Sequence, residues 1–315
     1  MTPINENLDL APRMSASIAR YADRNFDWNA FPRNEGYAGL ERAAAGFVGG
    51  SPNSKVNDPH TLKPEHFTVM MVHLPLGKYA ALHSHDVLEE SYLVFGGVLT
   101  VGWERDGELI EVRLGPKDMI SIANSIPHGL RNDGVEPAQF VVVAETGKPD
   151  RTRYYAHPRD TDPALAARLG VPPEKTMPFN PFDPHPLQQL MARHVVRYAD
   201  RAVSWDPAGF ARKVYAGEGA VKPSSNRKEL IFVPCGKGVK SYVRDVEDVY
   251  LITEGVVTVG WEEDGRVHEA RLGRKDVMFN PAGRPHYFRN EGTERCEFFM
   301  LVGSKEPERV KFQAC

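Results

Sequence analysis

The sequence predicts an all-β protein made of two tandem β-barrel domains with few short helices. Two observations support this prediction. The block from Tyr92 to Asp118 recurs from Tyr250 to Asp276, so the chain contains an internal duplication with a shift of 158 residues. Within each copy, short runs rich in Val, Leu, Ile and Tyr alternate with turn residues, and many short strands at close spacing are typical of a sandwich or a barrel.

The individual elements follow from local patterns. Residues 92–104 and 109–114 are predicted to be extended and to be joined as a hairpin across Asp106-Gly107, the strongest short-range hairpin signal. Further strands, each ended by Gly, Pro or charged residues, are predicted at 67–74, 139–143, 230–233 and 297–302. One short helix is predicted from its N-cap Asp162 to Gly170. The proline-rich stretch 171–186 is then expected to run extended and to connect the domains.

A second repeated pair gives the domain limits. RYADRNFDW begins at Arg20 and RYADRAVSW begins at Arg197, and because this motif occurs in both halves we interpret its charged residues as structural. The expected domains are an N-terminal barrel at 1–155, a linker with a short helix at 156–190, and a C-terminal barrel at 191–315. The first copy also carries an extra segment, 41–60, rich in Gly, Ser, Asn and Pro. It is predicted to be a long loop over the barrel mouth or against the neighbouring domain.

Composition excludes several classes of function. The chain has 315 residues, of which 41% are hydrophobic and 26% charged, and its net charge is −3. This balance, without a long Lys/Arg run, argues against a nucleic-acid partner. The sequence shows no apolar stretch long enough to cross a bilayer and no signal peptide. Three scattered cysteines do not form a disulfide framework. We therefore expect a cytoplasmic protein with no membrane partner.

Four residues of the first copy have the pattern of a metal site. His83 and His85 are two residues apart, so on a strand both imidazoles point to one face, and Glu90 and His128 follow. Three imidazoles and one carboxylate suit Fe(II), Mn(II), Ni(II), Cu(II) or Zn(II). A set of four ligands leaves one or two positions of an octahedral ion open for water, O₂ or substrate, as a catalytic site requires.

These residues resemble the motifs of the cupin superfamily. A first motif of glycine, five residues, HxH, three or four residues, glutamate, six residues and glycine is matched by Gly77, His83, His85, Glu90 and Gly97. The second motif is matched by Gly115, Pro127, His128 and Asn132, although its usual proline-x-glycine lead-in is replaced by Ala123-Asn124-Ser125. The resemblance covers both repeats and implies a bicupin, that is, two double-stranded β-helix barrels with the metal inside the barrel.

The glutamate ligand has a rival in its neighbour. Counting back seven residues from Gly97 gives Glu90, and the duplication supports Gly97 because it aligns with Gly255. Counting from Gly96 would give Glu89 instead. Strand alternation allows only one of the two glutamates to face inward, and we favour Glu90.

The second copy has lost the pattern. At a shift of 158, the first three ligands are replaced by Ser241, Val243 and Asp248, and only His286 is kept, opposite His128. The sequence therefore predicts one divalent metal ion per chain, with Fe(II) favoured. The C-terminal barrel is expected to be structural, and the protein is expected to form a homo-oligomer.

Two further residues are candidates for substrate binding. Alternation places Tyr92 on the same face as Glu90, where its hydroxyl could reach substrate, although Tyr250 matches it in the copy without ligands. His73 lies on the strand that leads into the first motif and could either line the pocket or form a buried hydrogen bond.

The resemblance also implies a class of function. Three histidines and one glutamate, with four residues before the glutamate, resemble the flavonol-cleaving quercetinases, which are also bicupins, whereas gentisate and salicylate dioxygenases usually lack the glutamate. We therefore expect a metal-dependent, Fe(II) dioxygenase that cleaves a small hydroxylated aromatic or enol-type substrate with O₂. The alternatives are a redox-neutral lyase, isomerase, decarboxylase or hydrolase that uses the metal as a Lewis acid, and a non-enzymatic ligand-binding cupin.

Overall fold

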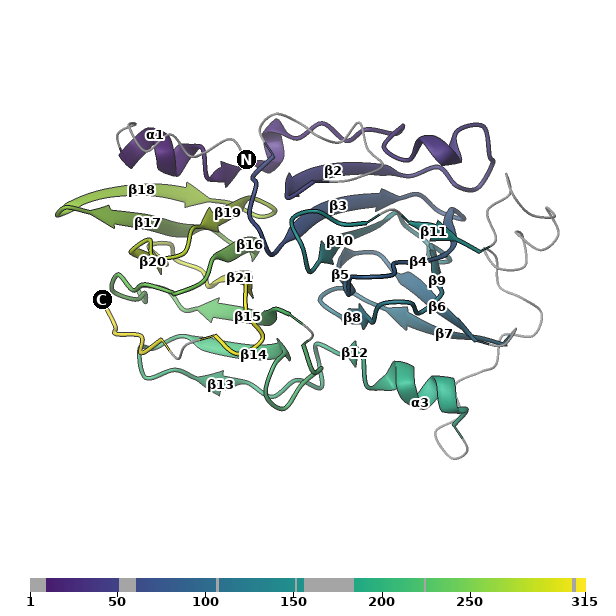
Figure 1. Ribbon diagram of the computed structural model, residues 1–315. Helices are drawn as coiled ribbons and strands as arrows, with labels where there is room; N and C mark the ends of the chain where they lie inside the picture. Colours follow the sequence, from purple (N-terminus) through teal and green to yellow (C-terminus); the bar gives the residue numbers. More distant parts are fainter. Residues whose placement is uncertain are drawn as a thin grey trace.

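The computed structural model describes residues 10–50, 61–105, 108–150, 152–155, 184–223, 225–307 and 310–315. Within them the chain is mostly β and forms two barrels that lie side by side (Figure 1), which confirms the predicted fold class. The helix predicted from Asp162, the stretch 171–183 and the turn at Asp106-Gly107 lie outside the described residues. Among the helices that are described, none is both long and apolar enough to cross a membrane.

The N-terminal barrel consists of two antiparallel sheets, with strand orders β12-β8-β5-β10-β3-β2 and β11-β4-β9-β6-β7. Its own strands are β2 (Ala43–Val48), β3 (Thr68–Leu74), β4 (Tyr79–Ser84), β5 (Glu90–Gly96), β6 (Leu99–Arg105), β7 (Glu108–Leu114), β8 (Met119–Ile122), β9 (His128–Arg131), β10 (Ala138–Ala144) and β11 (Arg153–Tyr154). The short helices of this half are η1 (Tyr21–Asp23) and η2 (Pro32–Asn34).

The C-terminal barrel repeats this plan, with strand orders β1-β19-β16-β21-β15-β14-β13 and β18-β17-β20. It follows helix α3 (Pro186–Ala192) and strand β12 (Val195–Val196). Its strands are β13 (Ser204–Trp205), β14 (Ala211–Ala216), β15 (Arg227–Val233), β16 (Asp248–Glu254), β17 (Val257–Glu263), β18 (Arg266–Leu272), β19 (Val277–Asn280), β20 (His286–Arg289) and β21 (Cys296–Val302).

Most predicted strands are confirmed, and two predictions need correction. The run 92–104 is divided between β5 and β6, because Gly97 turns the chain with a φ of 71°. A Cβ at Gly97 would lie 2.6 Å from the carbonyl oxygen of Pro137, so the turn requires glycine. The segment 41–60, predicted to be a loop, instead begins with the buried strand β2, while residues 51–60 lie outside the described part. Small residues in a run misled the prediction, because pairing with β3 overrides their weak strand propensity.

The barrels exchange their N-terminal arms. β1 (Ile18–Ala19), which follows helix α1 (Leu10–Ser15), pairs with β19 of the C-terminal barrel, and β12 pairs with β8 of the N-terminal barrel (Figure 1). The RYADR motifs fasten both arms in the same way. Arg20 binds Asp276 at 2.9 Å and Arg197 binds Asp118 at 2.7 Å. The motif is therefore structural. At one edge, each barrel includes a strand from outside its predicted sequence limits, 1–155 or 191–315, or gives one to the other barrel.

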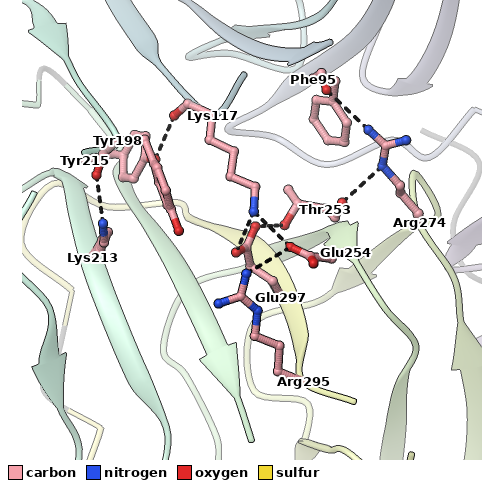
Figure 2. Close-up of polar contacts among 10 residues, drawn as sticks. All are labelled: Phe95, Lys117, Tyr198, Lys213, Tyr215, Thr253, Glu254, Arg274, Arg295 and Glu297. Carbon is pink, nitrogen blue, oxygen red and sulfur yellow. Dashed lines mark hydrogen bonds and ion pairs between the residues drawn. The ribbon is translucent and has the colours of Figure 1, made fainter. Parts of the chain in front are cut away.

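A continuous apolar core joins the two barrels, with Phe47 and Val141 from one side and Tyr215 and Phe299 from the other. Polar contacts at its edge cross in both directions (Figure 2). The Lys117 ammonium reaches two carboxylates of the C-terminal barrel, Glu254 at 2.9 Å and the fully buried Glu297 at 3.0 Å. In return, Arg274 donates to the carbonyl oxygen of Phe95 at 3.2 Å. The barrels therefore pack as one unit.

Candidate metal centre

Strands from both sheets of the N-terminal barrel, β4 and β9 from one and β5 from the other, bring the four predicted ligands together. His83 lies in β4 and pairs with His128, the first residue of β9, just after a β-bulge. His85 follows β4 directly, and Glu90 begins β5. One ligand atom from each of these four residues lies within 4.8 Å of the others. This spacing suits four donors around a single ion.

Backbone contacts fix the orientation of two imidazoles. His83 donates from Nδ1 to the carbonyl oxygen of Ala81 at 2.8 Å, and His128 donates from Nδ1 to that of Ile126 at 2.8 Å. Each donation leaves the Nε2 lone pair available, as in metal-ligating histidines. The third imidazole, His85, has its Nδ1 3.6 Å from an Asp150 carboxylate oxygen, outside hydrogen-bond distance.

The pKa values of Glu90 and His83 are shifted toward the protonation states that bind metals. Burial opposes ionisation of Glu90, but His85 and His128 outweigh this effect and lower its pKa to about 2. Burial and the two neighbouring imidazoles lower the pKa of His83 well below its ordinary value. A carboxylate and neutral imidazoles are the forms that ligate metals, so the donor set fits a divalent transition metal.

The two adjacent glutamates face opposite ways. Glu90 points to the histidines, with its Oε2 3.4 Å from Nε2 of His128. Glu89 is buried on the other face of the chain, where its Oε1 lies 4.0 Å from the ammonium of Lys228. That ammonium also pairs with Glu145 at 2.6 Å. Of the two candidates, the structure therefore places Glu90 in the cluster and Glu89 between the barrels.

The cluster opens into a cavity of about 100 Å³ inside the N-terminal barrel. Much of its lining is apolar, including Met70, Leu130 and Phe140. Tyr92 lines the cavity, as expected, and donates from its hydroxyl to Oε2 of Glu90 at 2.5 Å. Burial and the Glu90 carboxylate raise the Tyr92 pKa well above its ordinary value, so the phenol keeps its proton.

The expectation that His73 could line the pocket is wrong. Alternation along β3 turns Thr68, Met70 and Val72 toward the cavity, so the His73 side chain points the other way. Its ring packs edge-to-face against that of Trp28, with 5.9 Å between the ring centroids. His73 therefore does not contribute to the cavity.

Sequence reasoning missed a charged residue of the cavity. Arg42 immediately precedes β2, lines the cavity and is only 7% exposed. Its guanidinium carbon lies 3.9 Å from the ring centroid of Phe31. Burial lowers its pKa, whereas the nearby Tyr154, Tyr92 and Glu90 act in the opposite direction. The sequence signal was that Arg42 alternates with the small residues Ala44 and Gly46, as on one face of a strand. Predicting a loop over 41–60 concealed this pattern.

In the C-terminal barrel an arginine stands beside the equivalent carboxylate. Tyr242 pairs with His286 as His83 pairs with His128, so the aligned residues are Tyr242 and Arg244, not Ser241 and Val243. Arg244 forms an ion pair with Asp248, with its Nε 2.9 Å from a carboxylate oxygen, and Nε2 of His286 lies 3.2 Å from the same oxygen. The uniform shift failed here because the second copy is one residue shorter between Arg244 and Asp248.

We compared the chain with known proteins. Residues 70–144 match the family model described as a cupin domain. No curated protein matches the chain in sequence. Among solved structures, oxalate decarboxylase from Bacillus subtilis at pH 4.6 is similar, with a TM-score of 0.67 and 15% identity over 94% of this chain and 78% of that one. A mutant of the same enzyme has a TM-score of 0.67 and 14% identity over 94% of this chain and 79% of that one.

A third structure of that enzyme, from work on its Mn(II) centres, has a TM-score of 0.65 and 15% identity over 94% of this chain and 79% of that one. At these identities the match establishes the arrangement of the two barrels. Residues 70–144 are thus similar to a cupin domain, and the chain as a whole has the two-barrel fold of the oxalate decarboxylase structures.

Proposed function

We propose that this chain is a metal-dependent enzyme with one reaction centre, in the N-terminal barrel. The observation that carries the proposal is the cluster of His83, His85, Glu90 and His128, of which the first three line one cavity. A purely structural barrel does not require such a cluster, and a cavity with a mostly apolar lining and a few polar groups is typical of small-molecule sites. A bound divalent ion would supply Lewis acidity and, if redox-active, electron transfer to O₂.

The residues of the chain have separable tasks in this proposal. His83 and His128 are held by backbone carbonyls, so they present Nε2 without rearrangement. Tyr92 donates its one hydroxyl proton to Glu90, so its oxygen is left to accept a hydrogen bond from a donor group of a substrate in the cavity. The apolar lining excludes water from the reacting atoms and strengthens these polar interactions.

The reaction class that we propose first is an O₂-dependent cleavage. The volume of the cavity limits the size of the substrate. An engineered cavity of roughly 150 Å³ accommodates benzene, so about 100 Å³ is tight for an aromatic ring. An acyclic, enol-type substrate fits better than a hydroxylated aromatic. For this reaction we propose Fe(II) as the bound metal.

A redox-neutral lyase, such as a decarboxylase, is the second candidate. The same cavity size favours it, because small acids are compact, and the similar structures are those of a decarboxylase. Oxygen separates the two candidates. Purified protein is loaded anaerobically with Fe(II) or Mn(II) and assayed against small enols and acids with and without O₂. Substrate-dependent O₂ uptake supports the dioxygenase, whereas turnover that is unchanged without O₂ excludes it.

A variant distinguishes turnover at this site from turnover by a contaminating enzyme. His83→Ala removes one predicted ligand, and we expect it to abolish both metal content and turnover while the circular dichroism spectrum is retained. A fully active, metal-free H83A protein would refute the proposed reaction centre.

A further inference from the structure

Arg42 is a buried cation within the cavity of the predicted metal centre. Residues on the same face of β2, Gly46 and Val48, also line this cavity, and Ala44 packs in the barrel core. Because these neighbours are small, the long side chain of Arg42 supplies most of the polar surface that this strand offers to the cavity. Arg42, next to β2, and Glu90, the first residue of β5, thus reach the same cavity from two strands of one six-stranded sheet.

The hydrogen-bonding capacity of Arg42 is incompletely used. Its Nη1 is buried and has no hydrogen-bond partner among the described residues. The guanidinium stacks on Phe31 and interacts electrostatically with Tyr154, Tyr92 and Glu90. The Glu90 carboxylate is engaged by Tyr92 and the imidazoles. A buried donor without an acceptor is unfavourable, so this geometry is suited to an acceptor that arrives with a ligand.

The charges of the cavity specify what that acceptor is. Besides the imidazoles, the charged residues that line it within the described part of the chain are Arg42, Glu90 and Asp150. A bound divalent ion and Arg42 would together contribute three positive charges against the two negative ones of these carboxylates, an excess of one. A guanidinium fork matches a carboxylate in a bidentate manner, and it remains charged when buried. A planar carboxylate also suits the small volume of the cavity.

We infer that Arg42 binds a carboxylate group of the substrate, so that the substrate is a small carboxylic acid. This inference rests on the proposed function, because the same substrate must reach the cluster of His83, His85, Glu90 and His128. It deepens that proposal by naming the substrate class and the residue that selects it. Phe31 acts as a positioning residue, because its ring holds the guanidinium plane.

The test measures ligand binding to the Mn(II)-loaded protein by isothermal titration calorimetry, with acetate, glyoxylate and oxalate as anionic probes and acetamide as a neutral one. We expect the carboxylates to bind and acetamide to bind at least 10-fold more weakly. Arg42→Gln should weaken carboxylate binding by about 10- to 100-fold, the range for a hydrogen bond to a charged group. Equal affinity for acetate and acetamide would overturn the inference.

Arg153→Gln is the matched control, because it removes the same charge near the cavity from a side chain that is 65% exposed. We expect it to bind the probes like the wild type. Arg42→Lys keeps the charge without the planar fork and should weaken binding by at least about 5-fold. If Arg42→Gln does not fold, this second variant decides, and unchanged carboxylate affinity in it contradicts the inference.

Metal analysis of the same samples distinguishes the two proposals. Protein that takes up no Mn(II) contradicts the proposed function, whatever binds to Arg42. Protein that holds Mn(II) but does not prefer carboxylates contradicts only the role of Arg42. In EDTA-treated protein we expect carboxylates to bind more weakly but still to depend on Arg42.

Discussion

Asp248 of the second barrel aligns with Glu90 of the first. Replacing Asp248 with Asn tests whether its charge is needed to neutralise Arg244. Asp248 is fully buried and accepts a hydrogen bond from Asn280 at 2.7 Å. It also pairs with Arg244 at 2.9 Å and with His286 at 3.2 Å. Asparagine keeps the shape of the side chain but removes the charge. The Arg244 side chain, 6% exposed, would then be a buried cation without its counter-charge.

The expected cost is large because the pair is buried. Breaking one partner of a buried ion pair costs about 3–5 kcal/mol in the free energy of unfolding. Since 1 kcal/mol shifts Tm by about 2–4 °C in a domain of this size class, we expect a decrease of roughly 6–20 °C. Burial opposes ionisation of Asp248, but His286 and Arg244 outweigh it and lower the pKa below 3.8. The stabilisation is therefore complete above pH 3.8 and is lost as the pH falls through the lowered pKa.

The assay is urea unfolding at pH 7, followed by tryptophan fluorescence, to which Trp261 contributes; its indole donates to Asn280 in the same network. Asp248→Asn, Arg244→Met and the double variant form a thermodynamic cycle. We expect the double variant to be less destabilised than the sum of the two single variants. A loss below about 1 kcal/mol in Asp248→Asn, the range of a surface pair, would refute this account of the second barrel.

Three other predictions concern the ligands and the contact between the barrels. Glu90→Gln should lose the metal, whereas Glu89→Gln should keep one ion per chain by elemental analysis; the reverse result would make Glu89 the ligand. His83→Ala should lose the metal with an unchanged circular dichroism spectrum, and retained metal would remove His83 from the site. Burial opposes the charge of Lys117, but its hydrogen bonds to Glu254 and Glu297 outweigh this and raise its pKa above 10.5. Its stabilisation is thus complete below pH 10.5 and is lost as the pH rises through the raised pKa, so unfolding curves of wild type and Lys117→Met should converge at high pH; a constant difference would contradict this.

The sequence was sufficient for the features that depend on periodicity and repeats. The duplication predicted two barrels. Strand alternation allowed only one of Glu89 and Glu90 to face inward, and the match of Gly97 with Gly255 favoured Glu90, which the structure places beside His128. The Gly97 turn could be located because the duplicated copy carries Gly255, which also has a positive φ. These features are local, and local backbone geometry determines them.

Features that depend on long-range pairing could not be predicted in this way. The arm strand β1 has only two residues, and nothing in them indicates that they pair with β19 of the other barrel. Arg42 was missed for a related reason. A run of alanines before Gly46 has weak strand propensity, and β2 forms because β3 offers it a paired edge.

The second barrel shows the limit of alignment by a constant shift. The one-residue difference between Arg244 and Asp248 exchanges the inward and outward residues, and therefore Val243 is exposed while Tyr242 and Arg244 are buried. The register of Tyr242 with His286 resolves this, and the sequence alone does not contain it. The loss of the first two histidines was nevertheless predicted, because neither alignment places a histidine there.

The metal content of the purified protein tests the central claim most directly. The chain is saturated with Mn(II) or Fe(II) under anaerobic conditions, dialysed and analysed for bound metal, beside the His83→Ala variant. We expect close to one ion per wild-type chain and almost none in the variant, because the cluster identified among the described residues lies in the N-terminal barrel. Two ions per wild-type chain, or none, would contradict the account.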